Sequence, residues 1–366
     1  MTKLRELHEH GQSVWLDFIR RDMLGPDGEL ADLVADGIRG VTSNPSIFQK
    51  SISSSGFYDD QISEILARDP GASTVSVFEN LAVRDIRGAA DVLRRVYDAS
   101  GGADGFVSLE VAPDLAYDTE GTVADARRLW HMVDRPNLMV KVPATAEGIP
   151  AVEQLIADGL NINITLMFSM DDYESVAHAY LRGLHKAADP ASIASVASFF
   201  VSRVDAKADA ALEKVGTDEA LALRGRIAVA NAKLAYRRYQ ELFEGEPFAA
   251  LAARGARPQR VLWASTSTKN PEYTDTLYVD ELIGPNTVNT MPPQTIDAFR
   301  DHGTIDERAL LEDVEGAAAD IARLDDLGID FGEITMELQT EGVRAFADAA
   351  DDLLQTLADK IAALRA

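Results

Sequence analysis

Short apolar runs alternate with helical patterns along almost the whole chain, and this alternation constrains the fold more than any other feature. Runs typical of buried strands cover residues 13–19, 40–42, 105–111, 138–142, 162–168, 193–201 and 260–265, with a weaker one at 277–288. Helical spacing of apolar residues covers 29–36, 46–68, 77–99, 120–133, 149–158, 170–186, 203–243, 294–300, 306–326 and 341–364. Strands that alternate with helices predict βα units and a parallel sheet.

Repeated βα units fit a closed barrel better than an open sheet. A (β/α)8 barrel needs ~250 residues plus insertions, and the chain has 366. A doubly wound open sheet is the alternative, but the first predicted strand lacks the Gly-rich sequence of a dinucleotide-binding fold. We therefore predict an α/β protein, a (β/α)8 TIM barrel with additional helices, as one domain over residues 1–366. The pattern at 341–364 predicts a C-terminal helix packed on the barrel, across its mouth or at a dimer contact.

The composition argues against several kinds of partner and location. The net charge of −25 disfavours nucleic acid and anionic membranes as partners. No cysteine is present, which removes disulfides, thiolate metal sites and a cysteine nucleophile. No run approaches the ~18 apolar residues of a membrane span. The N-terminal sequence MTKLRELHEHGQS lacks the apolar segment of a signal peptide, so we expect a cytoplasmic protein.

The histidines do not suggest a metal site. They lie apart along the chain, and neither an HExxH nor an EF-hand pattern occurs. We therefore expect no metal and no other cofactor. Without a metal, a carbanion beside a carbonyl is stabilised by an iminium, which requires a lysine.

One lysine interrupts a predicted central strand. Lys141 lies in the sequence NLMVKVPAT at 137–145, where its neighbours are apolar. An ammonium without a partner in such a setting costs several kcal/mol. A lowered pKa relieves this cost and leaves a neutral amine able to attack a carbonyl. A carboxylate partner or a place on an edge strand is the structural alternative.

Polar and ionisable residues recur where the predicted strands end, which is where barrel enzymes place reactive groups. The candidates are Asp17, Asn44, Glu110, Lys141, Asn163, Thr165, Ser198, Arg203, Ser265, Ser267 and Lys269. Each has an ordinary explanation as well: Asn44 before Pro45 is typical of a helix N-cap, and Arg203 could pair with Asp205. Their recurrence on nearly every strand predicts an active site.

With their flanking residues, these positions resemble the transaldolase family. GVTSNPSIF at 40–48 is similar to one family signature, and NLMVKVPAT is similar to a second, with Lys141 at the Schiff-base lysine. SLEVAP, INITLMFS, SFFVSRVD and WASTSTKNP are similar to further segments in the expected order. The resemblance spans residues 17–271 and is to the longer bacterial subclass without a fused isomerase domain.

The resemblance implies a role for each catalytic residue. Lys141 would attack C2 of a ketose phosphate. Glu110 and Thr165 would hold the water that moves protons as the carbinolamine becomes an imine. Asp17 would remove the proton of the C4 hydroxyl and so cleave C3–C4.

The resemblance also implies the substrate contacts. Asn44 and Asn163 would hydrogen-bond the dihydroxyacetone fragment, Ser198 its hydroxyl, and Arg203 the phosphate. The chain departs from the family after Ser265, where better-known members have an arginine and this one reads Ser265-Thr266-Ser267-Thr268-Lys269. We expect Lys269 to be the second phosphate cation, supported by Ser267, although lysine offers a point charge where arginine offers a fork.

The resemblance implies transaldolase activity in the non-oxidative pentose phosphate pathway, with sugar phosphates as partners. We expect a monomer or homodimer, and the sequence does not decide between the two. The donor would be sedoheptulose 7-phosphate or fructose 6-phosphate, and the acceptor glyceraldehyde 3-phosphate or erythrose 4-phosphate. A fructose-6-phosphate aldolase of the same superfamily is the nearest alternative. Those aldolases carry Gln and Tyr around the catalytic water, where this chain has Glu110 and Phe200. A cofactor-free sugar-phosphate isomerase or epimerase and a non-catalytic binder are the others.

Overall fold

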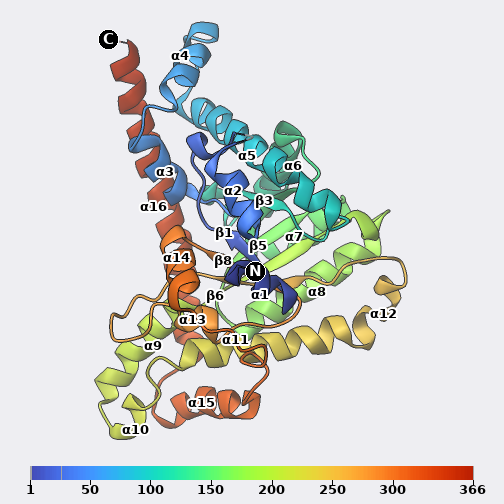
Figure 1. The fold of residues 1–366 in the computed structure, drawn as a ribbon, viewed down its shortest axis with the longest axis vertical. Helices are drawn as coiled ribbons and strands as arrows, with labels where there is room; N and C mark the ends of the chain where they lie inside the picture. Colours follow the sequence, from blue (N-terminus) through green and yellow to red (C-terminus); the bar gives the residue numbers. More distant parts are fainter. Residues whose placement is uncertain (1, 26, 366) are drawn as a thin grey trace.

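Eight parallel strands form a closed barrel in chain order in the computed structural model, which describes residues 2–25 and 27–365 (Figure 1). β1 pairs with both β2 and β8, so the barrel is confirmed and the open-sheet alternative is wrong. The strands are β1 (Gln12–Leu16), β2 (Ile38–Val41), β3 (Phe106–Glu110), β4 (Leu138–Pro143), β5 (Ile162–Met167), β6 (Ser195–Phe200), β7 (Arg260–Ala264) and β8 (Thr287–Met291).

Helices surround the barrel and fill the connections between its strands (Figure 1). In the described part of the chain they are α1 (Lys3–Glu9), α2 (Glu29–Asp36), α3 (Pro45–Ser53), α4 (Asp59–Arg68), α5 (Thr74–Ala99), α6 (Thr119–Val133), α7 (Gly148–Ala157), α8 (Met170–Lys186), α9 (Ser202–Val215), α10 (Asp218–Leu221), α11 (Ile227–Tyr239), α12 (Glu246–Ala252), α13 (Leu277–Asp280), α14 (Pro293–His302), α15 (Val314–Asp326) and α16 (Phe331–Arg365). Short 3₁₀ turns occur at η1 (Arg21–Met23), η2 (Pro113–Leu115) and η3 (Pro190–Ser192), and a π-helical turn at η4 (Gln240–Glu244). No helix of these residues is long and apolar enough to cross a membrane.

The register of the central strands brings the predicted catalytic residues level with one another. Glu110 on β3 lies opposite Lys141 on β4, and Lys141 lies opposite Asn163 on β5. Every residue of β4 and β5 is buried, as expected for parallel strands covered by helices. The barrel therefore carries Lys141 inside rather than on an edge strand.

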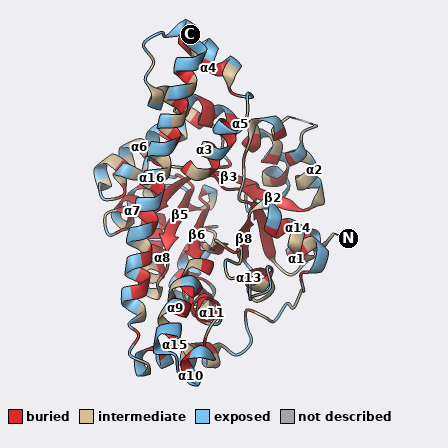
Figure 2. Cartoon of the chain, turned by 90° about the vertical axis from the view of Figure 1, so that its left-hand side faces the viewer, coloured by how far each residue is buried: buried red, intermediate tan, exposed pale blue. Residues whose placement is uncertain are grey.

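The C-terminal helix is the longest in the chain and spans most of the height of the molecule (Figures 1 and 2). It packs on α3, α5 and α9 and on the end of β5. Its buried side chains include Leu338, Phe346 and Leu357, and its exposed residues form the opposite face (Figure 2). The prediction of a C-terminal helix packed on the barrel is confirmed, and the helix begins earlier than predicted, at Phe331.

Several predicted boundaries were wrong. The region 277–288 contains α13 and a turn at Pro285-Asn286, and β8 begins only at Thr287. β8 reads TVNTM, so only two of its residues are apolar and it lacks the apolar run of a strand such as β4. The single helix predicted over 203–243 is broken at Gly216 and Gly225, both with positive φ, and β1 ends at Leu16, just before Asp17. The N-terminal helix α1 had not been predicted.

A buried ionic cluster holds the opposite, N-terminal end of the barrel together. Asp104 accepts hydrogen bonds from Ser13, from Trp15 Nε1 at 2.9 Å and from Arg39 Nε at 3.0 Å. Arg260 lies 3.5 Å away. Burial alone would raise the pKa of Asp104, but the charge of Arg260, the bonds from Ser13 and Trp15 and the charge of Arg39 outweigh it and lower that pKa. This end of the barrel is built for stability.

Candidate active site

A cavity of about 210 Å³ opens at the carboxyl ends of the strands, the end where barrel enzymes carry their chemistry. It brings together most of the residues predicted from sequence: Asp17, Asn44, Lys141, Thr165, Ser198, Arg203, Ser265, Ser267 and Lys269. Glu110 and Asn163 do not line it but contact residues that do. The strand-end pattern therefore locates one site rather than scattered structural residues.

Lys141 is enclosed at the base of this cavity. Its side chain is 7% exposed, and Nζ donates to the carbonyl of Ser43 at 3.2 Å and to Glu110 Oε2 at 3.5 Å. The ring of Phe346 lies 5.7 Å from Nζ. Val140 and Val142 hold the strand in the core on both sides. Lys141 thus has a carboxylate partner, Glu110, which we considered as a structural alternative. The contact is long, at 3.5 Å, and it lies beside the cavity that Asp17 lines.

Glu110 is a buried carboxyl group next to that amine. Burial raises its pKa, the charge and hydrogen bond of Lys141 oppose this, and the charge of Asp17 adds to it. The net pKa is above the ordinary value, so the carboxyl holds its proton to a higher pH than a solvated glutamate does. A group with a raised pKa beside an amine is suited to proton transfer.

Asp17 follows β1 and faces the cavity. Its Oδ1 accepts a hydrogen bond from Thr42 Oγ1 at 2.7 Å, and Thr42 in turn lies 2.6 Å from Thr290 Oγ1. Burial raises the pKa of Asp17, while the Thr42 hydrogen bond and the charges of Lys141 and Lys269 oppose the rise. The two threonines fix the orientation of a carboxyl group that is ready to take a proton.

Two polar residues of β5 have different tasks. Asn163 is buried beside the cavity, donates to Ser108 Oγ at 3.0 Å and accepts from Ser198 Oγ at 2.7 Å. It therefore orients Ser198. Thr165 is fully buried and lines the cavity, and its Oγ1 has no hydrogen-bond partner among the described residues. A buried hydroxyl left free in this way is expected to serve a bound molecule.

The cations Arg203 and Lys269 lie on the far side of the cavity from Glu110's strand. Arg203 belongs to the first turn of α9, where the helix dipole is positive. Burial lowers its pKa, and Glu341, which itself pairs with Lys207, only partly opposes this. Burial and the charge of Arg203 likewise lower the pKa of Lys269, whose Nζ donates to Ser267 Oγ at 2.7 Å. A partly buried arginine and an exposed lysine at the mouth of one cavity form a local basic site for a phosphate group on an otherwise acidic protein.

The loops that carry these residues are fixed by specific contacts. Asn44 caps α3 by accepting from the backbone N–H of Ile47 at 3.0 Å, so its capping and site roles coexist. Ser265 has a φ of 56° and lies 3.0 Å, Oγ to Oγ, from Ser202 at the start of α9. This contact ties the loop after β7 to the helix that carries Arg203.

Sequence reasoning missed several residues that line the cavity: Thr42, Thr290, Pro292, Gln294 and Phe346. Thr42 directly follows β2, so the strand-end rule could have found it. Thr290 and Gln294 were missed because the eighth strand was placed too early. Phe346 belongs to α16, and no local signal shows which turn of a long helix reaches the site. No group of three or more His, Asp or Glu side chains among the described residues is arranged to hold a metal ion.

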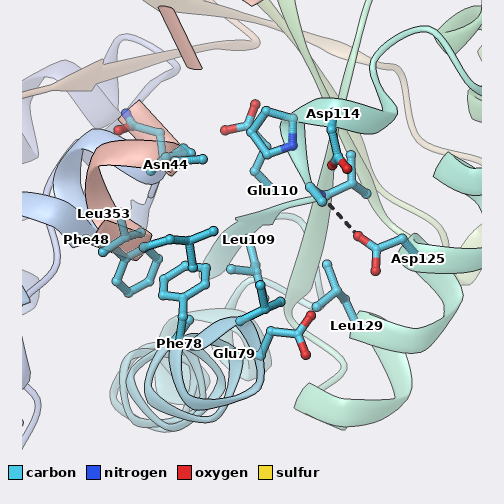
Figure 3. Close-up of a pocket in the computed structure, with 18 of the residues that line it drawn as sticks. Asn44, Phe48, Phe78, Glu79, Leu109, Glu110, Asp114, Asp125, Leu129 and Leu353 are labelled. Atoms are coloured by element: carbon cyan, nitrogen blue, oxygen red, sulfur yellow. Dashed lines mark hydrogen bonds between the residues drawn. The ribbon is translucent and has the colours of Figure 1, made fainter. Parts of the chain in front are cut away.

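A second cavity, of about 350 Å³, adjoins Glu110 and Asn44 and is lined mainly by apolar side chains such as Phe48, Phe78 and Leu129 (Figure 3). It is larger than the Lys141 cavity, but neither Lys141 nor Arg203 nor Lys269 lines it. We therefore assign the chemistry to the smaller cavity, because its residues can hold a carbonyl compound and a phosphate at the same time.

Comparisons with known proteins agree with this geometry. The family model described as Transaldolase/Fructose-6-phosphate aldolase matches residues 14–357. A transaldolase of Frankia alni is 49% identical over 98% of this chain and 97% of its own length. Transaldolases of Thermobifida fusca and Thiobacillus denitrificans are 48% and 50% identical, over 99% and 97% of this chain and 99% of each relative. The chain belongs to the transaldolase/fructose-6-phosphate aldolase family.

Proposed function

We propose that this chain is a transaldolase, which transfers a dihydroxyacetone unit from sedoheptulose 7-phosphate or fructose 6-phosphate to glyceraldehyde 3-phosphate or erythrose 4-phosphate. One observation carries the proposal: the amine of Lys141 lies inside the barrel, 3.5 Å from Glu110, in the same cavity as Asp17 and the cations Arg203 and Lys269. The relatives that share about half of its residues are named transaldolases.

The reaction begins with attack of the Lys141 amine on C2 of the ketose. The attack leaves an extra proton on nitrogen, which moves to the new oxygen to give the carbinolamine. A second proton at that oxygen then lets it leave as water. Glu110, with its raised pKa, supplies and recovers protons, and the free hydroxyl of Thr165 holds the water that carries them. The product is a protonated imine that draws electrons from C3.

Cleavage follows because Asp17 removes the proton of the C4 hydroxyl. The C3–C4 bond breaks, its electron pair passes to C3 as an enamine on Lys141, and the aldose leaves. Thr42 holds the Asp17 carboxyl in place throughout. The reaction reverses on a new aldose, whose aldehyde carbon is attacked by C3 and whose oxygen takes the proton from Asp17. Separate environments for the two carboxyl groups allow these separate tasks.

The remaining residues bind parts of the substrate away from the bond that breaks. Arg203 and Lys269 bind the phosphate. Ser265 and Ser267 support the loop after β7 that carries Lys269. Asn44 and Ser198 hydrogen-bond the hydroxyls of the three-carbon unit, and Asn163 acts through Ser198. Binding energy at a remote phosphate lowers the barrier by fixing the reacting carbons.

The assay that separates the candidate activities is the consumption of fructose 6-phosphate with and without erythrose 4-phosphate. A transaldolase consumes the donor only when the acceptor is present and forms sedoheptulose 7-phosphate in equal amount. Consumption at the same rate without acceptor, with free dihydroxyacetone as product, would show an aldolase instead. Conversion of the donor to an isomer, with Lys141→Ala still active, would show an isomerase or epimerase.

A glutamate at Glu110 and a phenylalanine at Phe200, where the aldolases of the family carry Gln and Tyr, support transfer over cleavage. A role in the non-oxidative pentose phosphate pathway follows from the substrates. A cytoplasmic location, a single domain over residues 1–366, a monomer or homodimer, and the absence of a cofactor stay predictions.

A further inference from the structure

The C-terminal helix α16 contributes a wall to the active site although it belongs to no strand of the barrel. Phe346 on this helix is 7% exposed, and its ring centroid lies 5.7 Å from Lys141 Nζ. The same side chain lines a narrow gap of about 10 Å³ next to Glu110. A gap of this volume is about the size of one water molecule, so the Phe346 side chain occupies most of the space on this side of Glu110.

Phe346 is held at this position by contacts one and two turns earlier in the helix. Gln339 Nε2 donates to the carbonyl of Ala144 at 3.0 Å and to that of Leu166 at 3.3 Å. Ala144 directly follows β4, the strand of Lys141, and Leu166 follows Thr165 on β5. Gly342 lies so close to Leu166 that an added Cβ would be 2.8 Å from Leu166 Cδ2. The helix is therefore in direct contact with both catalytic strands.

The ends of α16 are tied as well. Near its start, Glu337 and Glu341 pair with Lys207 of α9 at 2.6 and 2.7 Å. Near its end, Lys360 pairs with Asp59 at 2.8 Å and donates to the carbonyl of Ser55 at 2.7 Å. With anchors on both sides, Phe346 is a fixed part of the cavity wall.

We propose that Phe346 is a specificity-determining residue, which keeps bulk water from the three-carbon unit on Lys141 so that this unit is transferred to an aldose rather than released. The inference rests on the proposed transaldolase function. An aromatic ring suits the task for two reasons. It fills the space with apolar volume, and its face attracts the positive nitrogen of the iminium.

The two fates of the intermediate differ in what reaches C3. In transfer, the enamine carbon C3 bonds to the aldehyde carbon of the acceptor, the aldehyde oxygen takes the proton from Asp17, and water then releases the new ketose from Lys141. In release, C3 takes the proton from Asp17 instead. Water adds to C2 of the resulting iminium, the C2–N bond breaks, and Lys141 and free dihydroxyacetone are regenerated. Solvent access favours the second fate, because it supplies water before the acceptor arrives.

The test is the product ratio from fructose 6-phosphate and erythrose 4-phosphate, measured as free dihydroxyacetone per sedoheptulose 7-phosphate. Phe346→Ala should raise this ratio at least about tenfold over the unsubstituted protein, the equivalent of about 1.4 kcal/mol between the two barriers. Phe346→Leu, which restores most of the apolar volume, should return the ratio close to its original value.

The matched control is Leu357→Ala, a truncation of a fully buried residue of the same helix that does not line the Lys141 cavity. It should lower stability without changing the product ratio. The inference is overturned if Phe346→Ala leaves the ratio where Leu357→Ala does, or if Phe346→Leu releases as much dihydroxyacetone as Phe346→Ala.

Borohydride trapping with fructose 6-phosphate on every variant separates this outcome from failure of the proposed function. If the unsubstituted protein neither traps the donor on Lys141 nor transfers it, the proposed function fails and the role of Phe346 falls with it. If that protein traps and transfers but the ratio of Phe346→Ala is unchanged, only the role of Phe346 is refuted.

Discussion

Removal of the Arg203 guanidinium should distinguish a phosphate site from a structural cation. Arg203 lines the Lys141 cavity at the start of α9 and is largely shielded from solvent, and burial lowers its pKa. The nearest acidic influence, Glu341, pairs with Lys207 instead. A partly buried cation with so little compensation costs stability unless a ligand supplies the negative charge. Arg203→Ala should therefore affect phosphorylated substrates specifically.

The size of the effect follows from the contacts that are lost. A hydrogen bond to a charged group contributes about 1.5–3 kcal/mol, which corresponds to a loss of roughly 10- to 150-fold in kcat/KM for fructose 6-phosphate. Most of the loss should appear in KM, because the phosphate is bound equally before and during the reaction. An unphosphorylated donor such as dihydroxyacetone makes no such contact, so its kcat/KM should change by less than about twofold.

Steady-state kinetics with both donors and erythrose 4-phosphate measures this difference. Lys214→Ala is the matched control, since it removes a positive charge from the last turn of the same helix, outside the cavity. It should leave both donors almost unaffected. Equal losses for the phosphorylated and unphosphorylated donors in Arg203→Ala would refute a phosphate contact and indicate a structural role.

Loss of a buried carboxylate should change the stability in opposite directions at the two ends of the barrel, at Asp17 and at Asp104. Burial raises the pKa of Asp17, so its contribution to stability is present below the unfolded pKa of 3.8 and lost as the pH rises through the folded value. Asp17→Asn should thus raise the free energy of unfolding at neutral pH by about 1 kcal/mol. Below the unfolded pKa it should not raise the stability. The variant should have no activity at any pH. The pKa of Asp104 is lowered, so its contribution is present above the unfolded pKa and lost as the pH falls through the folded one. Asp104→Asn should lower the free energy of unfolding by about 3 kcal/mol at neutral pH. Thermal melts of both variants over a pH series measure these two changes in stability. If Asp17→Asn lowered the stability at neutral pH, the prediction for Asp17 would be contradicted. Thr165→Val should lower kcat on the order of 100-fold. It should not lower the stability, because the Thr165 hydroxyl has no hydrogen-bond partner among the described residues. Steady-state kinetics and thermal melts on one preparation test this, and a clear loss of stability would count against it.

The fold was predictable because its strands carry the signal that parallel sheets require. β4 and β5 are buried along their whole length, so their sequences are nearly continuous apolar runs that stand out from the helices. β8 was misplaced because Asn289 and the threonines beside it fill the barrel interior by hydrogen bonding, as in the bond that Thr266 donates to Asn289 at 2.9 Å. Polar interior residues remove the apolar pattern on which strand prediction depends.

The candidate site was predictable as far as it lies at strand ends. Position along a strand determines which face and which end a residue occupies, so Asp17, Lys141 and Thr165 could be placed together from sequence alone. Residues that reach the site from distant parts of the chain could not be placed there from sequence. The approach of Phe346 to Lys141 depends on where α16 crosses the barrel, which is fixed by contacts such as that of Gln339 with Leu166.

Borohydride reduction in the presence of fructose 6-phosphate, followed by peptide mass mapping, tests most directly whether Lys141 is the Schiff-base nucleophile. The account predicts one modified peptide, carrying a reduced three-carbon adduct on Lys141, because the aldose leaves before reduction. Lys141→Met should give no adduct and no transfer, while remaining folded. An adduct on a different lysine, or transfer that persists in Lys141→Met, would contradict the account.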